Sequence, residues 1–110
     1  MMDEIIPSEY YLGQNFPNPF KEATNIKYCL PVKSKVTITV FNSDCEMIKQ
    51  IVNDVQEAGT YEVKFNAQKF SGGEYLYMME AIDIGSGFDK IFNDTKKMNL
   101  LELNNQIINK

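Results

Sequence analysis

Short segments in which apolar and polar residues alternate recur along this chain, and they limit what it can fold into. Residues 36–41 alternate Val, Ile and Val with threonine and phenylalanine, and residues 60–65 place Tyr61, Val63 and Phe65 at every second position. Successive side chains of a strand point to opposite faces, so a period of two gathers the apolar residues on one face. The same spacing cannot form the apolar stripe of a helix. The chain is therefore expected to be all-β.

Turn residues divide the chain into about seven such strands. The first strand with clear alternation covers 24–30 and ends at Pro31, because proline cannot donate to a ladder. The further expected strands are 36–41, 47–52, 60–65 and 74–82, followed by 89–92 and 95–101, the two segments of a last strand that is interrupted around Asn93 and Asp94. Residues 53–58 are expected to form a loop. Residues 74–82 have apolar side chains at both odd and even positions, which predicts a central strand covered on both faces.

Short strands without an amphipathic helix predict two packed antiparallel sheets. The expected fold is an Ig-like or fibronectin-III-like β-sandwich, although the Ig hallmarks of a buried tryptophan and a cysteine pair are missing. The 110 residues suffice for one domain. We divide them into an irregular N-terminal segment (1–23), the sandwich (24–102) and a polar C-terminal tail (103–110).

Composition excludes several classes of function. The chain has no histidine, and all 11 of its positive charges are lysines in a net charge of −4, so a nucleic-acid partner is not expected. The spacing of Asp83, Asp89 and Asp94 matches no calcium loop, and they are expected to be solvated. No nucleophile stands with a base. We expect no enzyme activity, no metal and no cofactor.

The two cysteines and the start of the chain bear on export. Cys29 lies on the polar side of its strand and Cys45 in a turn, so both are expected to be free thiols, although export would allow a disulfide. No apolar run is long enough to span a membrane. The acidic start, Met1–Glu4, is not a signal peptide, so any export signal is expected on a larger precursor.

Seven short segments carry a family resemblance when they are taken in order. They are YLGQNFPNPF (11–20), TNIKYCLP (24–31), VTITVFN (36–42), AGTY (58–61), FNA (65–67), SGGEYLY (71–77) and TKKMNLL (95–101). In this order and spacing they resemble the type A C-terminal sorting domain of the type IX (Por) secretion system. The opening NFPNPF is also similar to that of a related Ig-like domain in the flagellar hook-capping protein. The chain departs from the family pattern in Asp44-Cys45-Glu46, where glycine is usual, and in running on through 103–110.

The resemblance implies a non-catalytic domain that directs secreted cargo to the type IX outer-membrane translocon. The cargo would precede it in a larger precursor, a sortase-like peptidase would commonly remove it, and the product would be secreted or held at the cell surface by way of the periplasm. By analogy, the expected partner-binding residues are Lys96, Lys97, Met98, Leu100, Gly72 and Gly73.

Other interpretations of the same residues stay open. Charges on an edge strand also discourage aggregation, and the glycine pair also supplies positive φ. The exposed last strand would also allow a weak homodimer by edge pairing. Phe16 and Phe20 would form a recognition patch or cap one end of the sandwich. The alternative functions are a structural Ig-like module of flagellar cap or adhesin type, and a carbohydrate-binding module. The latter would use Tyr10, Tyr11, Tyr75 and Tyr77, of which Tyr75 and Tyr77 are also predicted to be core.

Overall fold

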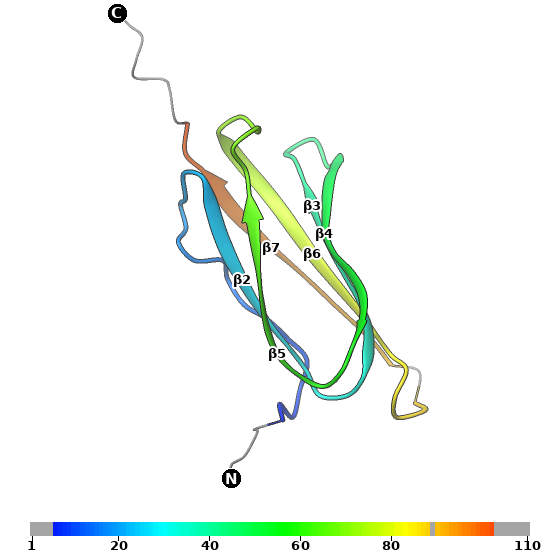
Figure 1. Cartoon of the computed structure of the whole chain (residues 1–110). Helices are drawn as coiled ribbons and strands as arrows, with labels where there is room; N and C mark the ends of the chain where they lie inside the picture. Colours follow the sequence, from blue (N-terminus) through cyan, green and yellow to red (C-terminus); the bar gives the residue numbers. More distant parts are fainter. Residues whose placement is uncertain (1–5, 89, 103–110) are drawn as a thin grey trace, which may run out of the picture.

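The computed structural model describes residues 6–88 and 90–102 and confirms an all-β fold. Its seven strands are β1 (Tyr11–Leu12), β2 (Ala23–Leu30), β3 (Ser34–Phe41), β4 (Met47–Gln56), β5 (Gly59–Asn66), β6 (Gly73–Asp83) and β7 (Ile91–Leu100). They form a three-stranded sheet in the order β1-β2-β5 and a four-stranded sheet in the order β4-β3-β6-β7. Figure 1 shows the two sheets facing each other with their strands along the length of the molecule. No helix of the described chain could cross a membrane.

The core lies between the sheets and follows the alternation of the sequence. On β3, Val36, Ile38 and Val40 are fully buried, while the residues between them face outward. Ile26, Tyr28 and Leu30 of β2 cover them from the other sheet and are equally buried. At roughly 25 cal/mol per Å² of buried apolar surface, this layer supplies most of the favourable free energy of folding.

Strand β4 is longer, and strand β7 more continuous, than the sequence predicts. The expected loop over 53–58 is wrong, because Asn53 to Gln56 pair with β3 as far as Ser34. Residues 53–56 are mostly polar and none of them is buried, so no apolar alternation marks this end of the strand, whereas the two register shifts of the β3–β4 pairing lie earlier, within 47–52. The expected interruption of the last strand is also wrong, since Asn93 and Asp94 keep their ladder partners on β6.

The expectation that the strand at 74–82 is covered on both faces is also wrong. This strand, β6, lies between β3 and β7, but only its inward residues are buried, among them Tyr77, Met79 and Ala81. The alternate residues, such as Leu76 and Met78, are half-buried by neighbours within the sheet. A central position within a sheet therefore does not by itself place another layer of structure over both faces.

The cysteines lie where the alternation places them. Cys29 is half-buried on the outer face of β2, and Cys45 is exposed in the β3–β4 turn with a positive φ of 66°. Both thiols are free, as expected.

We predict that Phe65→Ala strongly destabilises the domain. The ring of Phe65 is fully buried and packs against Phe20 and Phe70, so its removal leaves a cavity that costs about 3–5 kcal/mol. Urea unfolding measures the change. The matched control is Phe88→Ala, because that side chain is 76% exposed and its loss should change the free energy by less than about 0.5 kcal/mol. Equal effects of the two substitutions would contradict this assignment of the core.

Candidate recognition site at the last strand

Residues 13–20, here called the bridging segment, connect the two sheets at the edge formed by β7. The segment leaves β1 beside β2, where the Gly13 amide donates to the Lys27 carbonyl at 2.8 Å. It then crosses to β7, where the Phe20 amide donates to the Asn99 carbonyl at 3.0 Å. The Leu101 amide in turn donates to the Phe20 carbonyl at 2.8 Å. The segment therefore closes one side of the sandwich.

The two prolines of the bridging segment explain why it is not a regular strand. Neither Pro17 nor Pro19 has an N–H that could take part in a ladder. The backbone amides on either side, those of Phe16 and Phe20, both donate hydrogen bonds, to β2 and β7 respectively. The two sheets that this irregular stretch joins therefore supply the hydrogen-bond acceptors for its backbone amides.

Side chains of the bridging segment also bind the outer edge of β7. The Gln14 amide nitrogen donates to the Lys97 carbonyl at 2.7 Å, and the Asn18 side-chain oxygen accepts from the Asn99 amide at 2.9 Å. The Asp83 amide donates to the Lys90 carbonyl, so the backbone groups of even-numbered residues on this side of the ladder form hydrogen bonds with β6. The backbone N–H and C=O groups of the odd-numbered residues of β7 therefore point away from β6, toward the outer edge. The expectation of an exposed last strand is thus wrong for its C-terminal half, which the bridging segment covers.

The other half of the β7 edge is less protected. The Thr95 amide donates a hydrogen bond of 2.9 Å to the side-chain carboxylate of the preceding residue, Asp94. The outward backbone groups of Ile91 and Asn93 have no hydrogen-bond partner among the residues that the structure describes. A short open edge of about 91–95 therefore remains, and such an edge can accept a strand from a partner.

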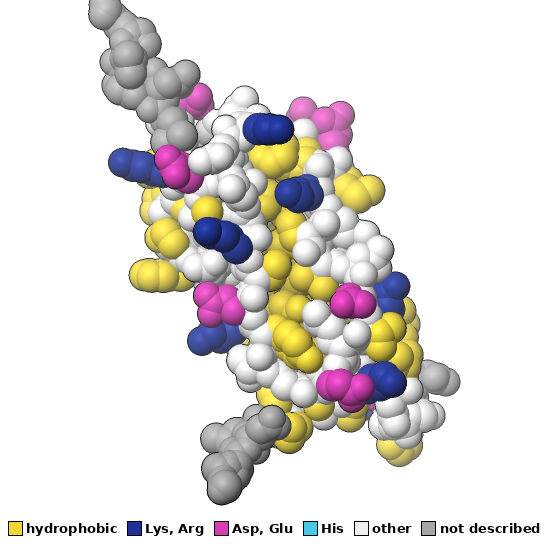
Figure 2. Space-filling view, in the orientation of Figure 1, with side chains coloured by type: hydrophobic (Ala, Val, Ile, Leu, Met, Phe, Trp, Pro, Cys, Tyr) yellow, Lys and Arg dark blue, Asp and Glu magenta, His cyan; other side chains and the backbone are white. Residues whose placement is uncertain are grey.

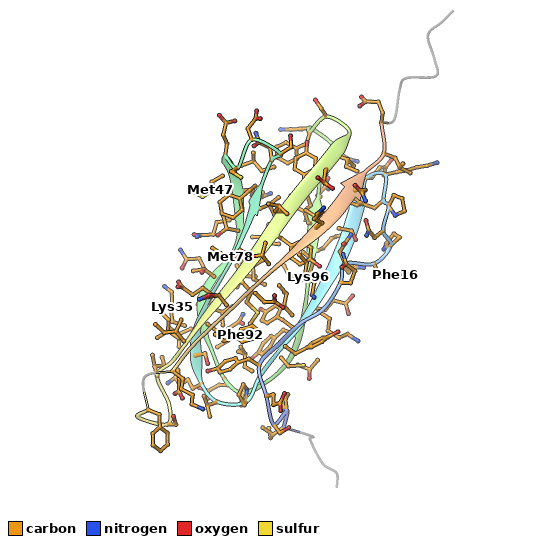
Figure 3. The ribbon with its side chains drawn as sticks, turned by 180° about the vertical axis from the view of Figure 1, so that it is seen from behind. Phe16, Lys35, Met47, Met78, Phe92 and Lys96 are labelled. Atoms are coloured by element: carbon orange, nitrogen blue, oxygen red, sulfur yellow. The ribbon has the colours of Figure 1, made fainter. Side chains whose placement is uncertain are left out.

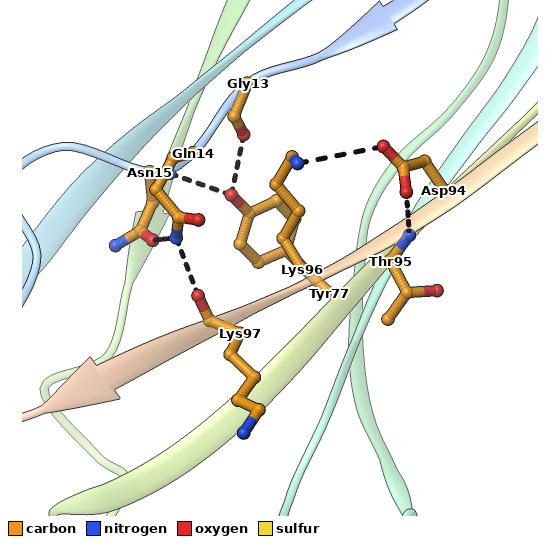
Figure 4. Close-up of polar contacts among 8 residues, drawn as sticks. All are labelled: Gly13, Gln14, Asn15, Tyr77, Asp94, Thr95, Lys96 and Lys97. Carbon is orange, nitrogen blue, oxygen red and sulfur yellow. Dashed lines mark hydrogen bonds and ion pairs between the residues drawn. The ribbon is translucent and has the colours of Figure 1, made fainter.

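A buried polar cluster fixes the base of the bridging segment (Figure 4). The Tyr77 hydroxyl accepts from the Asn15 amide at 2.8 Å and donates to the Gly13 carbonyl at 2.7 Å. The Asn15 side chain donates to the Thr24 hydroxyl at 3.0 Å. Burial raises the pKa of Tyr77 to about 12, and nearby charge adds to the rise, whereas the hydrogen bond from Asn15 opposes it. Since each group has a partner, the cluster stabilises one path of the chain.

The six expected partner-binding residues divide into two kinds. Met98 and Leu100 are core residues, with exposed fractions of 0% and 4%. Lys96 is half-buried and its ammonium lies 3.8 Å from the Asp94 carboxylate, as Figure 4 shows. Lys97 points to the opposite face, where it lies 3.5 Å from Glu74. Of these four residues of the strand, Lys96 and Lys97 are the two whose side chains reach the surface of the folded domain.

The glycine pair supports the end of β7 from the β5–β6 loop. The Gly72 amide donates to the Glu102 carboxylate at 2.8 Å, and a Cβ at Gly72 would lie 2.8 Å from the Glu102 backbone nitrogen. Gly73 has a positive φ of 145°. The backbone that approaches Gly72 closely is therefore that of Glu102 in the same chain. Contact of Gly72 and Gly73 with a partner stays a prediction.

The aromatic residues near the bridging segment do not form one surface. The expected capping of the sandwich is confirmed for Phe20, which is 1% exposed, and is wrong for Phe16, which is 78% exposed. Figure 3 shows Phe16 pointing away from the body. Of the four tyrosines of the carbohydrate hypothesis, Tyr75 and Tyr77 are core and Tyr10 stacks on Phe92. Only Tyr11 of the four is exposed, so no row of tyrosines is presented.

The acidic residues have structural roles here. Asp83 is buried, contrary to expectation, and its carboxylate accepts hydrogen bonds from the Ser86 hydroxyl and from the amides of Ser86 and Gly85. These bonds lower its pKa, the Ser86 side chain having the largest effect. Asp89 lies outside the described residues. Within the described part of the chain no three acidic or cysteine side chains come together to hold a metal.

Comparison with models of protein families gave a match over residues 14–94 to the family described as the secretion system C-terminal sorting domain. The matched range includes most of the bridging segment and the first part of β7. Comparisons with curated proteins and with solved structures gave no match.

We predict that Tyr77→Phe destabilises the domain by about 1–3 kcal/mol, because it leaves the Asn15 amide and the Gly13 carbonyl buried without a partner. The matched control is Tyr61→Phe, whose hydroxyl donates to the Glu57 carbonyl at the surface and should matter by less than about 0.5 kcal/mol. Urea unfolding compares the two. A Tyr77→Phe variant as stable as its control would show that the cluster does not hold the bridging segment.

The raised pKa of Tyr77 also predicts a loss of stability at alkaline pH. The unfolded chain ionises this tyrosine near pH 10, whereas the folded chain keeps it neutral up to about pH 12, so stability falls as the pH rises through this range. We expect the wild type to lose about 1–3 kcal/mol more than Tyr77→Phe over this interval. Unfolding titrations of both proteins at several pH values test the difference. Parallel pH dependences would contradict the assignment.

Proposed function

The chain belongs to the secretion system C-terminal sorting domain family, and we propose that β7 and the bridging segment together form the surface recognised by the type IX translocon. A domain of this family is a sorting signal for type IX secretion. It stands at the C-terminus of a cargo precursor and interacts with the secretion machinery, which exports the cargo across the outer membrane to the cell surface or the medium.

One observation carries the proposal: the beginning and the end of the domain meet in a single surface. The backbone of Lys97 and Asn99 is bound by Gln14, Asn18 and Phe20 of the bridging segment. A receptor that contacts this region therefore contacts both ends of the domain at once. Such a surface exists only when the domain is folded, so its recognition distinguishes a complete precursor from an unfolded one.

Two features of this surface suit a protein partner. The short open edge at 91–95 offers backbone groups for strand addition, which gives affinity without demanding a particular sequence. Lys96 and Lys97 present positive charge on opposite faces of the same strand, and this favours a receptor with acidic groups on both sides. Met98 and Leu100 act from within, because their burial anchors the strand that carries the lysines.

The remaining steps follow the family resemblance. We propose that a sortase-like peptidase separates the domain from its cargo after export, and that the domain contributes no catalytic group of its own. Edge pairing of two copies through β7 would be limited to the N-terminal half of that strand, since the bridging segment occupies the C-terminal half of the edge.

We predict that residues 1–110 direct a periplasm-targeted fluorescent protein out of the cell when fused to its C-terminus. The readout is fluorescence in the medium and on the cell surface, compared between a strain with an intact type IX system and a translocon-deficient strain. The double substitution Lys96→Glu, Lys97→Glu should lower the exported fraction by about tenfold or more, because it removes the proposed charge complementarity. The matched control reverses Lys35 and Lys49, which lie on β3 and β4 and are separated from β7 by β6.

Further fusions separate the possible outcomes. A fusion that ends at Glu102 tests the role of 103–110, and export of that fusion alone would show that these residues mask the signal. If folded fusions of both lengths stayed in the periplasm, the structural-module interpretation would be the better one. Export that is unaffected by reversal of Lys96 and Lys97 would place the recognised surface elsewhere on the domain.

A further inference from the structure

Strand β5 is a long regular edge of the three-stranded sheet. It pairs with β2 over its whole length, Gly59–Asn66, without a register shift. The Ala67 amide donates to the Glu22 carbonyl, so odd-numbered residues of β5 bond to β2 and even-numbered ones face away. The outward backbone groups of Thr60, Glu62 and Lys64 have no hydrogen-bond partner in the described part of the chain.

The other long edges carry protection that β5 lacks. On β7 the bridging segment and the Asp94 side chain cover much of the edge. On β4 the Asp54 side chain accepts from the Val55 amide at 3.0 Å, and two register shifts distort the strand. Bulges and capped amides are devices that prevent strand addition. A flat edge without them is a template for another strand.

The side of the sandwich next to β5 is open between the two sheets. Tyr61 and Val63 point inward yet are only half-buried, whereas Phe65 on the same face is fully buried. They line a groove of about 340 Å³ together with Ile51 and Val52 of β4. Figure 2 shows hydrophobic side chains along the molecule beside β5. Because three strands face four, a further strand beside β5 would cover this apolar surface.

The sequence of β5 is complementary to itself in one antiparallel register. A two-fold axis at Val63 places Glu62 of one copy opposite Lys64 of the other, and does so twice. The same register pairs Thr60 with Asn66 and brings Tyr61 opposite Phe65. Glu62 and Lys64 are also the residues whose backbone groups face outward, so the hydrogen bonds and the charge pairs fall on the same positions. In the single chain both side chains are exposed, and neither forms an ion pair within the described residues.

We propose that a second copy of this chain pairs with β5, forming a dimer through a continuous sheet with the order β1-β2-β5-β5-β2-β1. The surface buried in this dimer is that of one edge strand and part of a groove in each copy. Because such an interface is small, the dimer should form in a concentration-dependent way. Strands β4 and β7 are opposite edges of their sheet, and β5 lies over the β4 side. The dimer therefore leaves both copies of the β7 surface accessible.

The experiment is sedimentation velocity of residues 1–110 over a concentration series, with charge variants of β5. Lys64→Glu places like charges opposite each other twice and should weaken association by about tenfold or more. Glu62→Lys should do the same. The double variant Glu62→Lys, Lys64→Glu should associate like the wild type. An equimolar mixture of the two single variants should form heterodimers, because their charges are then complementary.

Two controls keep the outcomes separate. Lys49→Glu makes the same change of charge on β4 and should leave association unchanged, and thermal unfolding shows whether each variant is folded. Amide exchange should slow at Glu62 and Lys64 as concentration rises. A wild type that stays monomeric at the highest concentration would overturn the proposal and leave this edge to a strand of another protein. A dimer that is unaffected by Lys64→Glu, or that leaves both amides exchanging freely, would place the interface elsewhere.

Discussion

The hydrogen bonds between the bridging segment and β7 are the constraint on which the rest of the structure depends. They join residues near the start of the chain to residues near its end, and so they close the sandwich on one side. The buried Tyr77 hydroxyl fixes the start of the segment, and Phe20, which is 1% exposed, anchors its end in the core. Contacts between residues so far apart in the sequence are slow to form during folding, because the entropy cost of closing the long intervening loop must be overcome first. The surface at β7 is complete only when both ends of the domain have been made and folded.

The closed side and the open side of the sandwich have different consequences. On the closed side, the open edge of β7 is shortened to about 91–95, and Lys96 and Lys97 follow it on opposite faces of the strand, where we propose that a partner binds. On the open side, the edge of β5 is long, regular and flanked by half-buried apolar residues. The two edges belong to different sheets and lie on different sides, so occupation of one does not prevent occupation of the other.

Alternation was sufficient to predict the fold class and much of the core, because burial on one face follows directly from a period of two. Val36, Ile38 and Val40 are the clearest example, and the burial of Met98 and Leu100 on β7 follows the same rule. The rule failed on β4, whose end at 53–56 is mostly polar and not buried, and on β6, where apolar outer residues suggested a second covering layer that is absent from the described structure. The roles of Gln14, Asn15 and Asn18 could not be predicted, because their partners lie far along the chain and no local pattern identifies them.

Native-state amide hydrogen exchange along β7 tests the central claim most directly, in the wild type and in Asn18→Ala. The amides of Asn99 and Leu101, bound by the Asn18 side chain and the Phe20 carbonyl, should exchange far more slowly than the outward amide of Asn93. In Asn18→Ala the first two should exchange faster while amides of the β3–β6 pair keep their protection. Fast exchange of Asn99 and Leu101 in the wild type, at the rate of Asn93, would show that the bridging segment does not hold the last strand.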